Sequence, residues 1–255
     1  MDASSFQARL AFATDLIQEA GNVALGYFRR LETLVVKSKG LQDMASEADL
    51  NTEILIRDRL KARFPEDAFL GEETGRSEVT EDGGIWVVDP IDGTQPFLSG
   101  LGSWCISIAY VLGGKLEMGL VYSPVRQELF SGGLQAAATL NGNAIRVSAA
   151  GSLTNGIVGV GYSPRVKPDE FLSFFSNLLW SGGTFYREGS GALTLCYVAC
   201  GRLLGYIEPH INSWDCLGAI AVIQAAGGQI NDFLANEGLW KGNRIIAGPR
   251  LFTRL

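Results

Sequence analysis

One stretch of the sequence, WVVDPIDGT, combines several residue types that could bind a metal and a phosphate. It places two carboxylates, Asp89 and Asp92, at the end of an apolar, β-branched run that predicts a buried strand. Pro90 is expected to turn the chain so that both carboxylates face one point. Gly93 lets the backbone approach a ligand closely, and its amide and that of Thr94 can bind an anion. The stretch therefore predicts a metal and phosphate site.

A simpler explanation is that Asp-Pro and Asp-Gly are ordinary turn formers. Two further acidic sites argue against it, because Glu72 and Glu73 follow the apolar run 68–70 and Asp215 precedes the apolar segment 216–226. Magnesium takes a few carboxylates together with substrate phosphate oxygens, so carboxylates from separate parts of the chain suit it. No set of histidines and cysteines with zinc spacing competes with this interpretation.

Three motifs follow one another along the chain: GEE at 71–73, DPIDGT at 89–94, and WD at 214–215 followed by AGG at 226–228. In this order and at these separations they resemble the signatures of the inositol monophosphatase family of magnesium-dependent phosphatases. The resemblance extends over nearly the whole chain. It implies an α/β (α+β) fold, a layered α-β-α-β-α sandwich of the sugar phosphatase type.

The resemblance also implies two or three magnesium ions per active site. Glu72, Asp89 and the backbone carbonyl of Ile91 would hold a first ion. Asp89, Asp92 and Asp215 would hold a second, so that Asp89 bridges the two. Two metals about 4 Å apart form the clamp that is used for in-line phosphoryl displacement.

Catalytic roles follow from the same resemblance. Asp49 and Thr94 match the pair that orients and deprotonates the attacking water, beside the metal that Glu72 would hold. The amides of Gly93 and Thr94 would bind the phosphate. Asp49 is expected at the start of a helix, where the exposed amides favour a carboxylate.

Two weaker assignments concern the part of the substrate beyond the phosphate. Glu208 matches the position that hydrogen-bonds a hydroxyl of a sugar or inositol ring, and Gly191 stands where the family often has an alanine whose amide faces the substrate. Asp92 and Asp215 would also contact the substrate. His210, the single histidine of the chain, is expected to be a bystander beside Glu208.

Composition agrees with a globular enzyme, since 47% of the residues are hydrophobic and 19% are charged. The net charge of −6 argues against binding to nucleic acid or to an anionic membrane. No apolar run reaches the roughly 18 residues that span a bilayer, and the first residues lack the pattern of a secretory signal. We therefore expect a cytoplasmic protein whose four cysteines are reduced core thiols.

Hydrophobic periodicity predicts alternating helices and strands. In the first half, we expect a helix at 6–31 with Ser4 or Ser5 as its cap, a helix at 49–64, and strands at 103–112, 115–122 and 127–131. In the second half, we expect strands at 157–162, 203–208, near 229 and at 244–247, and helices at 168–180, 190–200 and 213–226. Residues 1–255 are expected to form a single domain of two closely packed halves that meet near 164–167.

The sequence departs from the family pattern at a few positions. Gln95 and Pro96 follow the DPIDGT motif where the family commonly has an asparagine, Asn212 and Ser213 replace a frequent His-Cys pair, and Gly191 replaces the usual alanine. None of these changes removes an expected metal ligand. The reaction class is therefore retained, whereas the identity of the substrate is left open.

The leading hypothesis is a magnesium-dependent phosphomonoesterase that acts on myo-inositol monophosphate. Histidinol phosphate and sugar phosphates are the alternatives on the same scaffold, because a carboxylate at Glu208 suits either a hydroxyl or an ammonium group. A third hypothesis is a non-catalytic regulator that binds a protein partner. The intact acidic set argues against it, since like charges destabilise a fold unless cations neutralise them. The resemblance also implies a homodimer.

Overall fold

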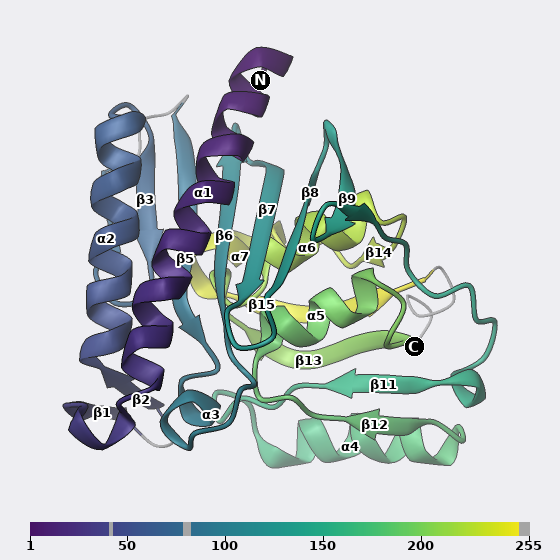
Figure 1. Cartoon of the computed structure of the whole chain (residues 1–255). Helices are drawn as coiled ribbons and strands as arrows, with labels where there is room; N and C mark the ends of the chain where they lie inside the picture. The colour runs from purple at the N-terminus through teal and green to yellow at the C-terminus, as the bar shows by residue number, and fades with distance from the viewer. Residues whose placement is uncertain (41–42, 79–82, 250–255) are drawn as a thin grey trace.

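The computed structural model describes residues 1–40, 43–78 and 83–249 of the chain. Two β-sheets alternate with three layers of helices (Figure 1). Helices α1 (Ala3–Phe28) and α2 (Glu47–Arg63) cover one face of an eight-stranded sheet, α5 (Gly191–Ala199) and α6 (Leu217–Ala225) lie between the sheets, and α4 (Pro168–Trp180) covers the outer face of a five-stranded sheet. This arrangement confirms the predicted α-β-α-β-α order.

The two N-terminal helices begin at side-chain caps. The cap of α1 is Asp2, whose carboxylate accepts a hydrogen bond from the amide of Ser5 at 2.8 Å. The expectation that Ser4 or Ser5 caps this helix was wrong, because the helix begins at Ala3 and both serines lie within its first turn. Helix α2 begins after Ser46, which forms a capping box with Asp49.

The eight-stranded sheet has the order β10-β9-β8-β7-β6-β5-β3-β4. Only β3 and β5 pair in parallel, and the remaining neighbours are antiparallel. The meander expected after residue 103 is present as β6, β7 and β8. The strands are β3 (Ala68–Gly71), β4 (Gly75–Arg76), β5 (Gly84–Asp92), β6 (Cys105–Leu112), β7 (Lys115–Ser123), β8 (Glu128–Gly133), β9 (Ala136–Leu140) and β10 (Asn143–Ala144).

Strand β5 does not end at Asp89 as expected. Asp89 pairs with Ser107 of β6, the register then shifts, and pairing resumes between Asp92 and Cys105. Pro90 has no amide proton to give to the neighbouring strand, so it produces an irregularity within the strand and not the turn that the sequence suggested. Both carboxylates therefore belong to one strand, on either side of a bulge.

The five-stranded sheet has the order β12-β11-β13-β15-β14. Its strands are β11 (Ile157–Val160), β12 (Thr184–Tyr186), β13 (Gly205–Ile211), β14 (Gln229–Ile230) and β15 (Asn243–Gly248). The short edge strand β12 was not predicted. Helix α6 begins at Leu217, four residues later than the predicted start at 213, because the residues before it form a turn that holds Asp215.

Several short elements complete the described chain. They are the hairpin of β1 (Val36–Gly40) and β2 (Asp43–Ser46), the helices α3 (Thr94–Leu98) and α7 (Gly238–Lys241), and 3-10 turns at Leu31–Thr33, Leu153–Asn155 and Ala235–Glu237. The chain passes from one sheet to the other between β10 and β11, whereas residues 164–167 lie between β11 and α4.

Hydrophobic side chains form three clusters: one beneath α1 and α2, one between the two sheets, and one beneath α4. The largest fills the space around α5 and α6, where Cys105, Cys196 and Cys216 are buried. All four cysteines are free thiols. None of the helices in the described ranges is both long enough and apolar enough to cross a membrane.

Candidate active site

The structure brings together three of the predicted metal ligands from distant parts of the chain. Glu72 follows β3, Asp89 lies on β5, and Asp215 precedes α6. One carboxylate oxygen from each of them lies within 4.8 Å of the other two. Parallel pairing of β3 with β5 places Glu72 beside Asp89, and α6 packs against the same sheet and carries Asp215 toward them.

Burial and mutual repulsion both disfavour ionisation of this cluster. The pKa of Asp89, which is 1% exposed, is raised well above its usual value by desolvation and by the charges of Glu72 and Asp92. Desolvation also raises the pKa of Asp215, although a hydrogen bond with Asp89 and the amide of Asn212 oppose that shift. Because the cluster offers only carboxylate oxygens, it fits a hard divalent cation such as Mg²⁺, which would neutralise it.

Asp92 is placed differently from these three residues. Its carboxylate accepts hydrogen bonds from the hydroxyl of Ser190 at 2.5 Å and from the amides of Ala192 at 2.7 Å and Gly191 at 3.3 Å. These donors form the N-terminus of α5, where a carboxylate is favoured. Desolvation and the charge of Asp215 still raise the pKa of Asp92 to about 7. Asp92 therefore ties β5 to α5, and its other predicted role as a metal ligand stays a prediction.

The predicted pair for handling water, Asp49 and Thr94, is in contact. The hydroxyl of Thr94 lies 3.3 Å from a carboxylate oxygen of Asp49 and 3.2 Å from the carbonyl of Ile91. The other carboxylate oxygen of Asp49 accepts hydrogen bonds from the amide and the hydroxyl of Ser46, at 2.8 and 2.6 Å. The capping box of α2 thus fixes the orientation of Asp49, and Ile91 presents its carbonyl at the same place.

Gly93 lies between Asp92, the last residue of β5, and the start of α3. Its φ of 96° is in the left-handed region, and it is the N-cap of α3. A side chain at this position would meet the carbonyl oxygen of Ser103 at 2.8 Å. Glycine is therefore required here by both the backbone angle and the space.

A buried carboxylate that the sequence did not reveal supports the Glu72 loop. Glu53 lies on α2, is fully buried, and accepts hydrogen bonds from the amides of Glu73 at 2.8 Å and Thr74 at 2.6 Å. Its carboxylate also approaches Gly71 so closely that a side chain there would collide with it. Glu53 has an ordinary helical position in the sequence, so only the tertiary contact identifies its role.

Asn212, which the sequence marked only as a departure from the family pattern, holds Asp215. Its backbone amide and its side-chain amide both donate to one oxygen of Asp215, at 3.2 and 3.0 Å. The neighbouring Ser213 donates to the carbonyl of Leu239 at 2.7 Å. This residue pair therefore fixes the third carboxylate of the cluster and anchors its turn.

A cavity of about 110 Å³, which we call the ring-end pocket, extends from the acidic cluster. Glu208 lines it, is 7% exposed, and accepts a hydrogen bond from the hydroxyl of Tyr206 at 2.7 Å. Desolvation raises the pKa of Glu208 to about 8. The pocket is lined by Asp92, Val160, Gly161, Tyr162, Arg187, Gly189, Ser190, Gly191, Thr194, Tyr206, Glu208, Ile211 and Asp215.

Two glycines keep this pocket open. A side chain at Gly161 would collide with the hydroxyl of Tyr206 and the carboxylate of Glu208, and one at Gly191 would meet Ile211 at 2.7 Å. The structure thus places Gly191, Glu208, Asp92 and Asp215 around one cavity, and their binding to substrate stays a prediction.

His210 lies outside the described lining of the ring-end pocket. Its Nε2 atom is 3.0 Å from the carbonyl oxygen of Lys241. This contact fixes the ring, and the bystander role of His210 stays a prediction.

Comparisons with known proteins agree with the geometry. The sequence profile of the inositol monophosphatase family matches residues 6–255. A protein of Haemophilus influenzae named Nus factor SuhB is 32% identical over 243 residues, which cover 94% of this chain and 91% of that protein. The Pseudomonas aeruginosa protein of the same name is 33% identical, and the match covers 98% of this chain and 94% of that protein.

Solved structures show the same similarity. The extragenic suppressor protein suhB of Bartonella henselae superposes with a TM-score of 0.89 at 31% identity, covering 96% of this chain and 95% of that one. Inositol monophosphatase from Anabaena superposes with a TM-score of 0.82 at 28% identity, covering 97% and 92%. On the evidence of its motifs, its layered fold and these matches, the chain belongs to the inositol monophosphatase family.

Proposed function

We propose that this protein is a magnesium-dependent phosphomonoesterase that hydrolyses a small phosphate monoester, with myo-inositol monophosphate as the leading candidate. The observation that carries the proposal is the acidic cluster of Glu72, Asp89 and Asp215, which lies next to the Thr94–Asp49 pair and opens into the ring-end pocket. A metal, a water and the leaving alcohol of a phosphate ester each have a place in this arrangement.

Magnesium held by Glu72, Asp89 and Asp215 would neutralise phosphate charge and lower the pKa of a water. The hydroxyl of Thr94 passes its proton to the carboxylate of Asp49. The Thr94 oxygen then has a lone pair that takes up a proton from the attacking water. The water oxygen forms the new bond to phosphorus, the bond from phosphorus to the ester oxygen breaks, and the leaving alkoxide takes up a proton from solvent. The amides of Gly93 and Thr94 bind the phosphate, beside Asp92.

Glu208 and Tyr206 line the pocket where the leaving alcohol is expected to bind, so they limit which alcohols fit. A carboxylate at Glu208 accepts a hydrogen bond from a ring hydroxyl of inositol or a sugar, and it equally suits the ammonium group of histidinol. Histidinol phosphate and sugar phosphates are therefore the alternative substrates. The solved family members named as inositol monophosphatases favour inositol monophosphate among the three.

Phosphate release tests this proposal. The panel contains myo-inositol 1-phosphate, histidinol phosphate, fructose 1,6-bisphosphate and adenosine 3′,5′-bisphosphate, each assayed with magnesium and with chelator. We expect release that depends on magnesium and is highest for one monoester. Absence of release from every compound would contradict the phosphatase assignment.

The second candidate function is binding to another protein chain, since two relatives carry the name Nus factor. It is favoured by exposed apolar side chains on α4 and the edge strand β12, where Trp180 is 88% exposed, Leu172 55% and Phe185 50%. The resemblance implied a homodimer without naming its surface, and we expect a second copy of this chain to bind at this one. Light scattering on the wild type and on Trp180→Ser tests it: a dimer that the substitution weakens is expected, and a monomeric wild type would contradict it.

A further inference from the structure

The ring-end pocket contains one cationic side chain among the described residues that line it, and the proposed reaction gives that side chain no role. Arg187 precedes the Gly189–Gly191 loop, and its side chain is exposed at the pocket, whereas Glu208 at the same pocket is 7% exposed. A substrate whose phosphate reaches the acidic cluster would extend past Glu208 toward Arg187.

The guanidinium group of Arg187 is available for a ligand. Within residues 1–40, 43–78 and 83–249, its side chain makes no hydrogen bond and no ion pair. Two neighbouring arginines differ in this respect, since Arg126 pairs with the buried Glu188 and Arg202 pairs with Glu128. An arginine that lines a substrate pocket and has no carboxylate partner can donate two parallel hydrogen bonds to a carboxylate or a phosphate of the ligand.

Arg187 lines the ring-end pocket together with Glu208 and Tyr206, whereas Gly93 and Thr94, whose amides are expected to bind the reacting phosphate, are not among the residues that line it. The positive charge of Arg187 acts on Glu208 and Tyr206, where it opposes the rise in pKa that desolvation causes. An anionic group next to Arg187 is therefore a different group from the phosphate that reacts at Asp215.

We propose that Arg187 binds a second anionic group on the leaving alcohol. The preferred substrates are then polyol or sugar phosphate monoesters that carry a carboxylate or another phosphate at the end remote from the ester that is cleaved. This inference rests on the proposed phosphatase reaction and narrows its substrate class. Inositol monophosphate would contact Glu208 but leave Arg187 without a ligand, so we expect it to be a weaker substrate than a monoester with a second anion.

A different role for Arg187 would be to lower the pKa of Glu208. In that case its removal would change the turnover of every substrate by the same factor, because the effect would not depend on the far end of the leaving alcohol. Binding of a second anion predicts instead a change in the ratio between charged and uncharged substrates. The change should appear in KM, since the contact exists in both the ground state and the transition state.

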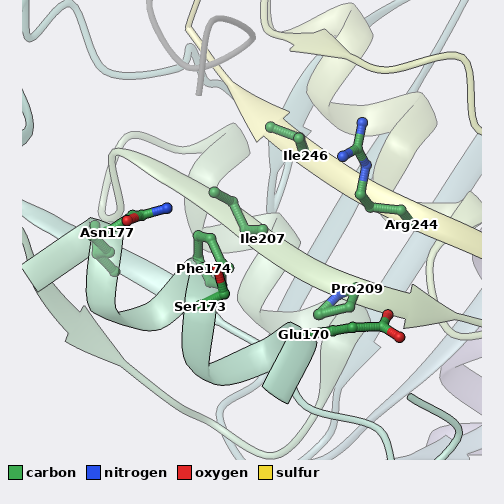
Figure 2. Close-up of a pocket in the computed structure, with 9 residues that line it drawn as sticks. Glu170, Ser173, Phe174, Asn177, Ile207, Pro209, Arg244 and Ile246 are labelled. Carbon is green, nitrogen blue, oxygen red and sulfur yellow. The ribbon is translucent and has the colours of Figure 1, made fainter. Parts of the chain in front are cut away.

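Arg244 supplies a matched control. It lines a separate cavity of about 340 Å³ between α4 and the five-stranded sheet, opposite Phe174 (Figure 2). Ile207 and Pro209 of β13 line this cavity, whereas Glu208 between them lines the ring-end pocket, because successive residues of a strand point to opposite faces. The substitution Arg244→Gln removes the same charge from the other side of β13.

The experiment compares three substrates that differ only at carbon 1: glucitol 6-phosphate with a hydroxyl, 6-phosphogluconate with a carboxylate, and glucitol 1,6-bisphosphate with a phosphate. The values of kcat/KM for release of the 6-phosphate are measured with magnesium for the wild type, Arg187→Gln, Arg187→Lys and Arg244→Gln. Isotopic labelling of the 6-phosphate distinguishes the two phosphates of the bisphosphate.

We expect the wild type to favour one or both of the charged substrates over glucitol 6-phosphate. Arg187→Gln should lower the ratio of kcat/KM between the charged substrate and glucitol 6-phosphate by about fivefold, the scale of an exposed ion pair. Arg187→Lys should keep part of this preference, and Arg244→Gln should leave it unchanged. The charged substrate that responds identifies the anion as carboxylate or phosphate. Equal ratios in the wild type and Arg187→Gln would overturn the inference and leave the phosphatase standing. No release from any of the three would also overturn the inference, and the phosphatase proposal would then be decided by the substrate panel described above.

Discussion

Asp89 and Asp92 come from one motif and one strand, yet their surroundings are opposite. Asp89 receives one backbone hydrogen bond, from Ile91 at 2.9 Å, and faces the carboxylates of Glu72 and Asp215. Asp92 accepts a hydroxyl and two amides from the start of α5. The first carboxylate thus has mainly other carboxylates around it, whereas the second connects β5 to α5. Identical residue types three positions apart therefore have opposite electrostatic surroundings, which suits Asp89 to a cation and gives Asp92 a structural role.

The substitution Asp89→Asn has the largest expected effect and tests whether Asp89 binds a metal. It should lower kcat/KM for phosphate release by about 100-fold or more, since even residues behind a metal ligand contribute about 10–100-fold. Without magnesium the variant should be as stable as the wild type or more stable, because it removes one like charge from a buried cluster. Phosphate release and thermal unfolding in chelator measure the two effects. A variant that keeps its turnover would contradict the role of Asp89 as a ligand.

The substitution Thr94→Val keeps the shape of the side chain and removes the hydroxyl that contacts Asp49 and Ile91. We expect kcat to fall by about 100-fold, within the range of general acid-base contributions, and KM to change little. Steady-state kinetics at saturating magnesium measure both quantities. Thr154→Val, in an exposed 3-10 turn, serves as the control. An unchanged kcat in Thr94→Val would remove Thr94 from the handling of water.

The dependence of stability on pH tests the ring end of the site. Burial raises the pKa of Glu208 from 4.5 to about 8, so the folded protein binds a proton that the unfolded chain releases between these values. The contribution of Glu208 to the free energy of unfolding is therefore fully present below about pH 4.5 and is lost as the pH rises through about 8. Between these values the free energy of unfolding falls by at most about 1.4 kcal/mol per pH unit. Chemical unfolding in chelator from pH 5 to 9 should show a shallower decline for Glu208→Gln. Identical slopes would contradict the buried position of Glu208.

The smallest expected effect concerns the hydrogen bond from Ser190 that holds Asp92 to α5. Ser190 donates to Asp92 and accepts from the amide of Leu193 as the N-cap of α5. Ser190→Ala should lower the free energy of unfolding by about 1 kcal/mol. Ser173→Ala, at an exposed position of α4, is the matched control. Urea denaturation in chelator measures both variants, and equal stability of Ser190→Ala and the wild type would show that this hydrogen bond does not hold Asp92 to α5.

Much of the acidic cluster could be predicted because each carboxylate ends or begins an apolar run. Glu72 and Asp89 follow short apolar runs of the sequence, and Asp215 precedes a long apolar segment, so the linear pattern indicated their positions. The helix predicted at 168–180 also has the observed bounds, since its proline start and amphipathic spacing are local signals.

What the sequence could not supply depends on contacts between distant segments. The serine that holds Asp92 is Ser190, 98 positions away, and Glu53 supports the loop of Glu72 from another element. The bulge at Pro90 follows from pairing with β6, and the edge strand β12 forms only because β11 lies beside it. No local pattern of residues encodes such pairings.

The most direct test of the central claim is a crystal structure of the protein grown with Mn²⁺, which substitutes for Mg²⁺ at carboxylate sites and gives anomalous scattering. The account predicts an anomalous difference peak among the carboxylates of Glu72, Asp89 and Asp215, and its loss in Asp89→Asn. A fully ordered site with no peak among these three residues would contradict the assignment of the cluster as the catalytic metal centre.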